Sequence, residues 1–133
     1  MNIQDIEGIG AVYAEKFKSA DVQTTDDLLA KGGTAKGREG LAAATGLTEK
    51  QILEFVNRAD MYRVNGIGSE MADLLEAAGV DTVAELAQRN ANNLAEAVKI
   101  LNDEKQKVRS VPSADEIGKW IEQAKSLPRA VEY

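Results

Sequence analysis

Apolar residues recur at helical spacing along most of the chain. After Thr48, four of them fall at i, i+3, i+4 and i+7, the spacing of one buried helix face: Ile52, Phe55, Val56 and Ala59. The same spacing recurs in Met71, Leu74, Leu75 and Ala78. No run of alternating β-branched residues predicts a strand. We therefore expect an all-α fold of about eight helices, near residues 11–20, 25–31, 36–45, 49–60, 69–78, 83–89, 92–108 and 114–126.

Hydroxyl residues mark the expected helix starts. In a capping box, a Ser or Thr side chain accepts from an amide of the first helical turn, and an acidic or amide side chain three residues later returns a bond. Four such pairs occur: Thr24 with Asp27 (the shorter variant), Thr48 with Gln51, Thr82 with Glu85, and Ser113 with Glu116. Gly46 and Gly79 stand where helices are expected to end.

The pattern repeats once along the chain. A shift of 58 positions aligns residues 6–29 with 64–87 without a gap and places Gly8-Ile9-Gly10 on Gly66-Ile67-Gly68. A second block matches at a shift of 65, where Phe55 meets Trp120, so about seven extra residues enter the second copy near Asn102–Val111. We expect two pseudo-symmetric repeats, residues 1–61 and 62–133, packed as one compact unit.

The repeat also predicts the core. The inward positions of the two copies are Ile9, Phe17, Leu28, Ile52, Phe55, Ile67, Leu75, Leu86, Ile117 and Trp120. Trp120 lies on an apolar helical face, so we expect core packing instead of base stacking, and we expect Tyr13 to pack beside its turn. If Phe55 is buried, its replacement by Ala should cost about 3–5 kcal/mol.

The motif most relevant to function is apolar–x–Gly–Ile–Gly, at residues 6–10 and 64–68. The first glycine can take positive φ, and the second can allow close approach of the backbone to a neighbour. The central isoleucine is expected in the core. A helix then begins, and its unpaired amides and positive dipole end suit a phosphate.

These segments resemble helix-hairpin-helix motifs. Together with Lys31-Gly32-Gly33-Thr34, residues 54–60 and residues 75–82, they resemble an uncharacterised bacterial family of tandem helix-hairpin-helix proteins, over nearly the whole chain. The resemblance implies one helix-hairpin-helix unit plus a capped helix in each repeat. It also implies a relationship to DNA-binding modules, in which backbone amides of the hairpin bind a phosphate and a nearby Lys or Arg strengthens that binding.

The charge pattern does not favour strong nucleic-acid binding. The net charge is −6, with −3 in each repeat, whereas non-specific binding depends on Lys and Arg. Ala11-Val12-Tyr13 follow Gly10, and Ser69-Glu70-Met71 follow Gly68, so no cation follows either turn. The first turn, with Lys16 and Lys18 nearby, is the better candidate. The predicted nucleic-acid-binding residues are Gly8, Ile9, Gly10, Ala11, Lys16, Lys18, Lys36, Arg38, Gly66, Ile67 and Gly68.

Two further cationic segments have ordinary explanations. Residues 31–38 are expected to form an inter-helix loop with solvated lysines, with a phosphate-binding backbone nest as the alternative. Lys99, Lys105, Lys107 and Arg109 are expected on a solvated helix face, with binding as the alternative.

The residue types also restrict the chemistry. The chain has no Cys and no His, which removes thiolate chemistry, imidazole catalysis and the metal sites built on them. No catalytic motif, membrane-length apolar run or leader pattern occurs. We expect a cytoplasmic, non-catalytic protein without metal, cofactor or small-molecule ligand. Two functions remain open: weak, non-specific DNA binding through phosphates, or a protein-interaction scaffold that has lost DNA binding.

Overall fold

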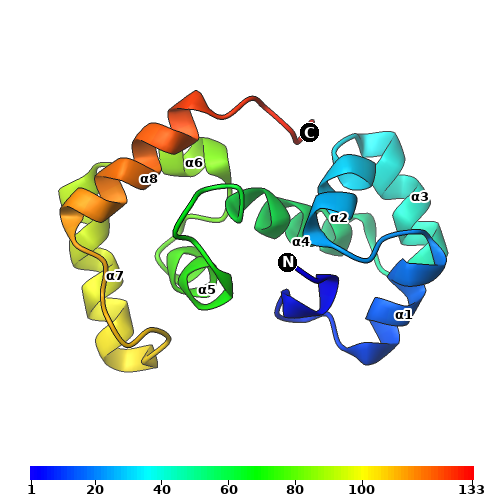
Figure 1. Cartoon of the computed structure of the whole chain (residues 1–133), viewed down its shortest axis with the longest axis horizontal. Coiled ribbons are helices and arrows are strands. Elements are labelled where there is room, and N and C mark those ends of the chain that lie inside the picture. Colours follow the sequence, from blue (N-terminus) through cyan, green and yellow to red (C-terminus); the bar gives the residue numbers. More distant parts are fainter. The chain divides into compact units, whose positions relative to one another are not determined.

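The chain is folded entirely into helices and their connections. A computed structural model describes residues 1–133, and one isolated β-bridge, between Asn2 and Thr24, is its only strand-like pairing. The elements are η1 (a 3₁₀ turn, Ile3–Asp5), α1 (Ala11–Ser19), α2 (Thr25–Gly32), α3 (Ala35–Thr45), α4 (Glu49–Met61), α5 (Ser69–Ala77), α6 (Val83–Ala87), α7 (Ala91–Lys105) and α8 (Ala114–Ser126) (Figure 1). The predicted all-α class with about eight helices is confirmed.

All four predicted capping residues form an N-capping hydrogen bond at the start of a helix. Thr24, Thr48, Thr82 and Ser113 accept from the amide three residues later, at 3.0 to 3.1 Å. The Thr24 box is complete, because the Asp27 carboxylate also accepts from the amide of Thr24. Side-chain hydrogen bonding therefore fixes where these helices begin.

The chain divides into two compact units. Unit 1 comprises Met1–Asp60 together with Arg129–Tyr133, and unit 2 comprises Met61–Pro128. The predicted division between residues 61 and 62 lies one residue from this boundary. The last five residues differ from the expectation, because they lie with the first part of the chain. Their physical attachment is the burial of Val131 and a 2.7 Å hydrogen bond from the Glu132 amide to the Gly33 carbonyl.

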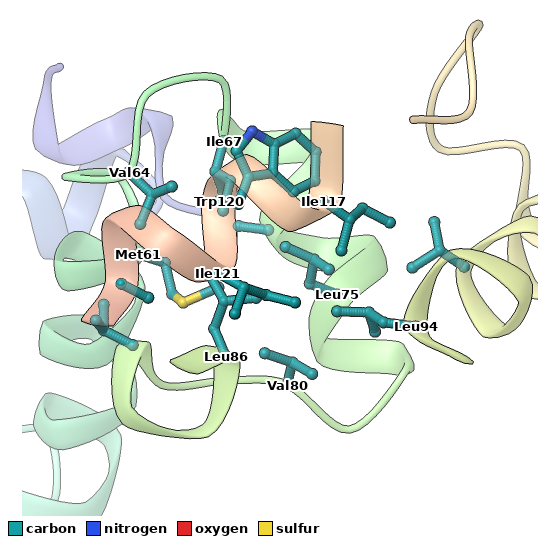
Figure 2. Close-up of a cluster of buried hydrophobic side chains, with 14 of the residues drawn as sticks. Met61, Val64, Ile67, Leu75, Val80, Leu86, Leu94, Ile117, Trp120 and Ile121 are labelled. Carbon is teal, nitrogen blue, oxygen red and sulfur yellow. The ribbon is translucent and has the colours of Figure 1, made fainter. Parts of the chain in front are cut away.

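Each unit has its own core. Unit 1 buries Phe17, Val22, Leu28, Ile52 and Val56 completely. Unit 2 buries a cluster that includes Leu75, Leu86, Ile117 and Trp120, with Leu94 contributed by α7 (Figure 2). Nine of the ten predicted core residues are buried; the exception is Phe55, which is half-buried. Sequence position alone could not separate it from Trp120, its buried counterpart.

The insertion in the second repeat forms a loop. Helix α7 ends at Lys105, three residues before the predicted end, because Gln106 takes a left-handed conformation (φ 50°) and donates its amide to the Asn102 carbonyl. Residues 106–113 then lead to α8. The buried Asn102 side chain holds this loop, since it donates to the Val108 carbonyl and accepts from the Val108 amide, both at 3.0 Å.

Candidate functional site

The two apolar–x–Gly–Ile–Gly segments adopt the same local geometry. We call residues 6–10 the first glycine turn and residues 64–68 the second glycine turn. Gly8 and Gly66 have φ of 96° and 100°. In each turn, the amide of the central isoleucine donates to the carbonyl three residues earlier, at 3.1 and 3.2 Å. The sequence repeat is therefore matched by the same backbone conformation within each turn.

Packing and backbone conformation together favour glycine at the first glycine position of each turn. A Cβ atom at Gly8 would lie 3.3 Å from the Phe55 ring, and one at Gly66 would lie 2.7 Å from Nε1 of Trp120. Positive φ adds a second reason, because side chains other than glycine rarely adopt it. These glycines hold each turn against the aromatic residue of the last helix in its repeat. The separate match of Phe55 to Trp120 was the sequence signal for this contact.

The second glycine of each turn is not required by packing. Gly10 and Gly68 have φ of −84° and −103°, which any residue can adopt, and a Cβ atom added at either would meet nothing within 4 Å. The prediction that the second glycine allows close approach to a neighbouring part of the chain is therefore wrong. The space that a side chain would occupy at these two positions is instead open.

Each second glycine is also the residue at which a helix begins. Gly10 is the N-cap of α1 and Gly68 that of α5, and a glycine has no side chain with which to cap its helix. The amides of a first helical turn have no partner within the helix. Ile9 and Ile67 are buried as predicted, while Gly10 and Ala11 are exposed. A ligand at these turns would therefore meet backbone amides and not the isoleucine side chains.

The two lysines of α1 lie on different sides of the first glycine turn. Lys18 and Ala11 line one groove, together with Asn2 and Gln23. The Nζ of Lys16 lies 5.6 Å from the centroid of the Tyr13 ring, a cation–π contact, and it extends toward Gly46 at the end of α3. Both lysines are exposed. Lys18 is thus the cation that shares a surface with the open end of α1.

Arg38 does not belong to an exposed binding surface. It is 5% exposed, and its guanidinium donates to the carbonyls of Gly32, Gly33 and Glu132. A phosphate could reach it only if these bonds broke. The prediction that Arg38 contacts nucleic acid is corrected on this ground, whereas Lys36 is exposed in the first turn of α3.

Residues 31–38 form a packed corner, neither a solvated loop nor a phosphate nest. Only Gly33 and Thr34 separate α2 from α3, and Thr34 caps α3 by accepting from the Gly37 amide. A Cβ atom at Gly32 would lie 2.5 Å from Val56, and one at Gly37 would lie 1.9 Å from the Lys31 carbonyl oxygen. The glycines of this segment therefore serve close packing between helices.

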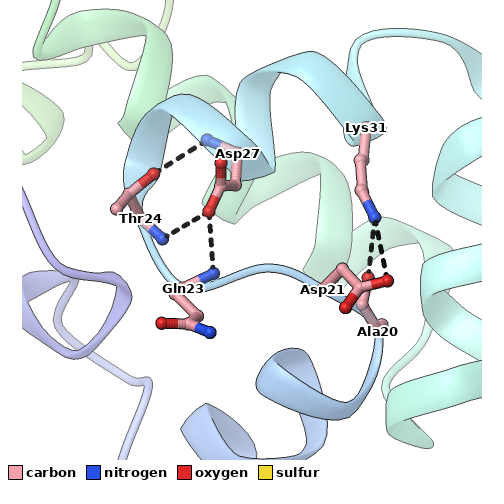
Figure 3. Close-up of polar contacts among 6 residues, drawn as sticks. All are labelled: Ala20, Asp21, Gln23, Thr24, Asp27 and Lys31. Carbon is pink, nitrogen blue, oxygen red and sulfur yellow. Dashed lines mark hydrogen bonds and ion pairs between the residues drawn. The ribbon is translucent and has the colours of Figure 1, made fainter.

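A hydrogen-bonded corner joins α1 to α2 (Figure 3). The Asp27 carboxylate accepts from the amides of Gln23 and Thr24, at 3.1 and 3.2 Å. These bonds hold the pKa of Asp27 below its ordinary value, with a smaller contribution from Lys31. The Lys31 ammonium donates to the Ala20 carbonyl at 3.0 Å and lies 3.9 Å from Asp21. The anionic form of Asp27 therefore stabilises the start of α2.

Cations of the inserted loop lie in a groove with the first turn of α5. Glu70 and Met71, in the first turn of α5, line a groove together with Lys107 and Arg109. The Asn102 bonds hold Val108 between these two cations, which are exposed. The predicted position of Lys107 on a helix face is wrong, because α7 ends at Lys105. The seven-residue insertion itself was the sequence signal, since it carries both cations.

No group of three or more acidic residues is placed to hold a metal ion. No helix combines the length and the apolar character needed to cross a bilayer.

Comparison with known proteins identifies a family. No curated protein and no solved structure was found to match the chain. A family model described as "Domain of unknown function (DUF4332)" matches residues 7–127, which include all but the first residue of the first glycine turn, the whole second turn and all eight α-helices. Because this match spans most of the sequence, the chain belongs to the DUF4332 family.

Proposed function

We propose that the chain is a cytoplasmic, non-catalytic tandem helix-hairpin-helix module that binds nucleic acid weakly, through the phosphate backbone and without sequence preference. One observation supports the proposal: twice in the chain, a glycine that packing does not require is the N-cap of a helix. The backbone amides and the dipole at a helix N-terminus favour an anion. The resemblance of both turns to helix-hairpin-helix motifs supports the choice of nucleic acid.

The charges around the turns set the expected strength. Lys18 shares a groove with the start of α1, where Glu15 opposes it. Lys107 and Arg109 share a groove with the start of α5, where Glu70 opposes them. With two to four phosphate contacts, log K should fall with log salt at a slope of about −2 to −4. The dissociation constant at physiological salt should lie on the order of 10⁻⁴ to 10⁻⁶ M.

An anisotropy titration of labelled duplex and single-stranded DNA, in low salt and then at increasing salt, tests the proposal. Lys16→Glu/Lys18→Glu should abolish or strongly weaken binding, and Glu70→Lys should strengthen it, with circular dichroism unchanged. Glu39→Lys, at an exposed position of α3, is the matched control, because it adds positive charge outside both glycine turns. Absence of binding by the wild type at about 50 mM salt, up to high protein concentration, would reject the nucleic-acid proposal.

The second candidate function is a protein-interaction scaffold that has lost DNA binding. The net charge of −6 favours it. So does Val12, which is 69% exposed in the first turn of α1, because an exposed apolar side chain suits a protein partner better than a phosphate. If DNA does not bind, Val12→Asp should abolish any partner interaction recovered by pull-down, while Val12→Ala should only weaken it.

A further inference from the structure

The groove beside the first turn of α5 is a feature of the second repeat alone. Its volume is about 740 Å³, and ligand-binding pockets commonly measure about 300–1,000 Å³. One wall is formed by Glu70 and Met71 of α5, and the other by residues 106–110 of the inserted loop. The first repeat has no counterpart of this loop, so only one of the two copies has such a groove.

Buried contacts fix the inserted loop in place. The Asn102 side chain, 8% exposed, donates to the Val108 carbonyl and accepts from the Val108 amide, both at 3.0 Å. Val108 and Val111 pack against the core of unit 2. Lys107 and Arg109 lie on either side of Val108, are exposed and line the groove. Because the backbone that carries them is already ordered, a ligand need not order it on binding.

The groove combines side chains that together suit a ribonucleotide. Lys107 and Arg109 outnumber Glu70, so the groove favours an anionic group such as a phosphate. The Glu70 carboxylate repels a phosphate but can accept a hydrogen bond from a hydroxyl, as acidic side chains do from ribose. Met71 and Val108 offer apolar surface to a sugar or base, and a guanidinium can stack on an unpaired base. A phosphate, a 2′-hydroxyl and an unpaired base occur together in single-stranded RNA.

We infer that this groove binds a ribose–phosphate unit of single-stranded RNA, with the phosphate on Lys107 and Arg109 and the 2′-hydroxyl on Glu70. The site rests on the proposed nucleic-acid function and gives it a preferred ligand. DNA brings the same phosphate without the 2′-hydroxyl, so Glu70 repels it and gains no hydrogen bond in return. A paired strand keeps its bases away from Met71 and Val108.

The test compares matched oligonucleotides on the full chain by anisotropy at low salt. The probes are labelled single-stranded RNA and DNA of one sequence, and the same RNA annealed to its complement. The wild type should bind single-stranded RNA at least about threefold more tightly than the DNA, the effect of one added hydrogen bond. Glu70→Ala should remove this preference, because it deletes both the acceptor and the repulsion, with circular dichroism unchanged.

Glu15→Ala is the matched control. It removes an exposed acid that shares the groove at α1 with Lys18, where cation and acid balance. This variant should leave the ratio of RNA to DNA affinity at its wild-type value. A ratio that falls equally in Glu15→Ala and Glu70→Ala would overturn the inference, because the preference would then depend on overall charge.

The remaining outcomes separate this site from the proposed function. Equal binding of RNA and DNA by the wild type, or a preference that survives Glu70→Ala, would overturn the inference and leave the proposed function standing. Equal or tighter binding of the annealed RNA would overturn it too, as would a free ribonucleoside monophosphate that binds as tightly as the strand. If the wild type binds neither RNA nor DNA, the proposed function itself fails, and this site with it.

Discussion

A Cβ atom added at Gly66 would lie 2.7 Å from Nε1 of Trp120, so the second glycine turn rests directly on the indole ring. The first turn has a looser version of this contact, since a Cβ atom at Gly8 would lie 3.3 Å from Phe55. The two repeats therefore share one packing plan, in which a left-handed glycine faces an aromatic residue of the last helix, but unit 2 packs more tightly there.

Gly66→Ala should destabilise the protein by about 2–4 kcal/mol, because the positive φ and the clash with the indole act together. Urea denaturation measures the change. The matched control is Gly40→Ala, at an exposed position of α3 where an added Cβ atom would meet nothing within 4 Å. That control should stabilise by about 0.5–1 kcal/mol. Equal midpoints for Gly66→Ala and wild type would contradict the described packing.

Trp120→Ala should cost more stability than Phe55→Ala. Burial of Trp120 predicts a loss of about 3–5 kcal/mol, whereas the half-buried Phe55 should lose about 1–3 kcal/mol, less than its sequence position predicted. Denaturant unfolding of both variants under the same conditions gives the comparison. The reverse order would mean that the first repeat, not the second, has the tighter aromatic contact.

Acid should weaken the start of α2 through Asp27. Its pKa is lowered in the folded chain by the amides of Gln23 and Thr24. The resulting stability is present above the unfolded pKa, about 4, and is lost as pH falls through the lower folded pKa. Asp27→Asn should therefore lose stability at neutral pH and show a smaller further loss between about pH 4 and pH 2. Asp26→Asn is the matched control, because the exposed Asp26 carboxylate accepts none of these amide bonds, and it should leave the stability at neutral pH close to that of the wild type.

Gly10→Ser should raise stability and weaken DNA binding at the same time. The Gly10 backbone (φ −84°, ψ −177°) suits an N-cap serine, whose hydroxyl would bond an amide of α1. We expect about 0.5–1 kcal/mol of stabilisation, because serine also restricts the unfolded chain. The same hydroxyl would occupy the amide offered to a phosphate. Unchanged DNA affinity in a stabilised Gly10→Ser would show that these amides do not bind the ligand.

Lys107→Glu/Arg109→Glu should reduce the salt dependence of DNA binding. Loss of one or two phosphate contacts lowers the salt slope by about 1 per contact. The control is Lys99→Glu/Lys105→Glu, which makes the same change in net charge at two exposed positions of α7. Neither position lines the groove that contains Glu70. If both double variants weaken binding equally, the effect is one of overall charge and the inserted loop has no special part in it.

Local signals predicted most of the fold, because helix starts depend on nearby residues. The hydroxyl at Thr82, for example, fixes the start of α6 through an amide three residues away. The end of α7 was less predictable, since Gln106 carries no glycine signal for its left-handed backbone. The aligned segments 6–29 and 64–87 predict backbones that superpose, and this stays a prediction, supported by the similar φ angles of Gly8 and Gly66, 96° and 100°.

The candidate site was predicted only in part, because its cations depend on long-range contacts. The glycine-rich sequence around Arg38 predicts an exposed cation, yet Arg38 is buried. Its guanidinium donates to the carbonyl of Glu132, a residue 94 positions later in the sequence. Lys107 lies in a groove with Glu70 for a similar reason, since Asn102 folds the loop back. No local pattern encodes either arrangement.

The chain contains a single tryptophan, and it lies in the core of unit 2. Its intrinsic emission should therefore follow the unfolding of unit 2, while the far-ultraviolet signal of the helices follows both units. Coincident transitions would identify the two units as one cooperative block, and separated transitions would identify them as two. The natural sequence thus carries an optical reporter that can divide the folding energy of the repeats without any label.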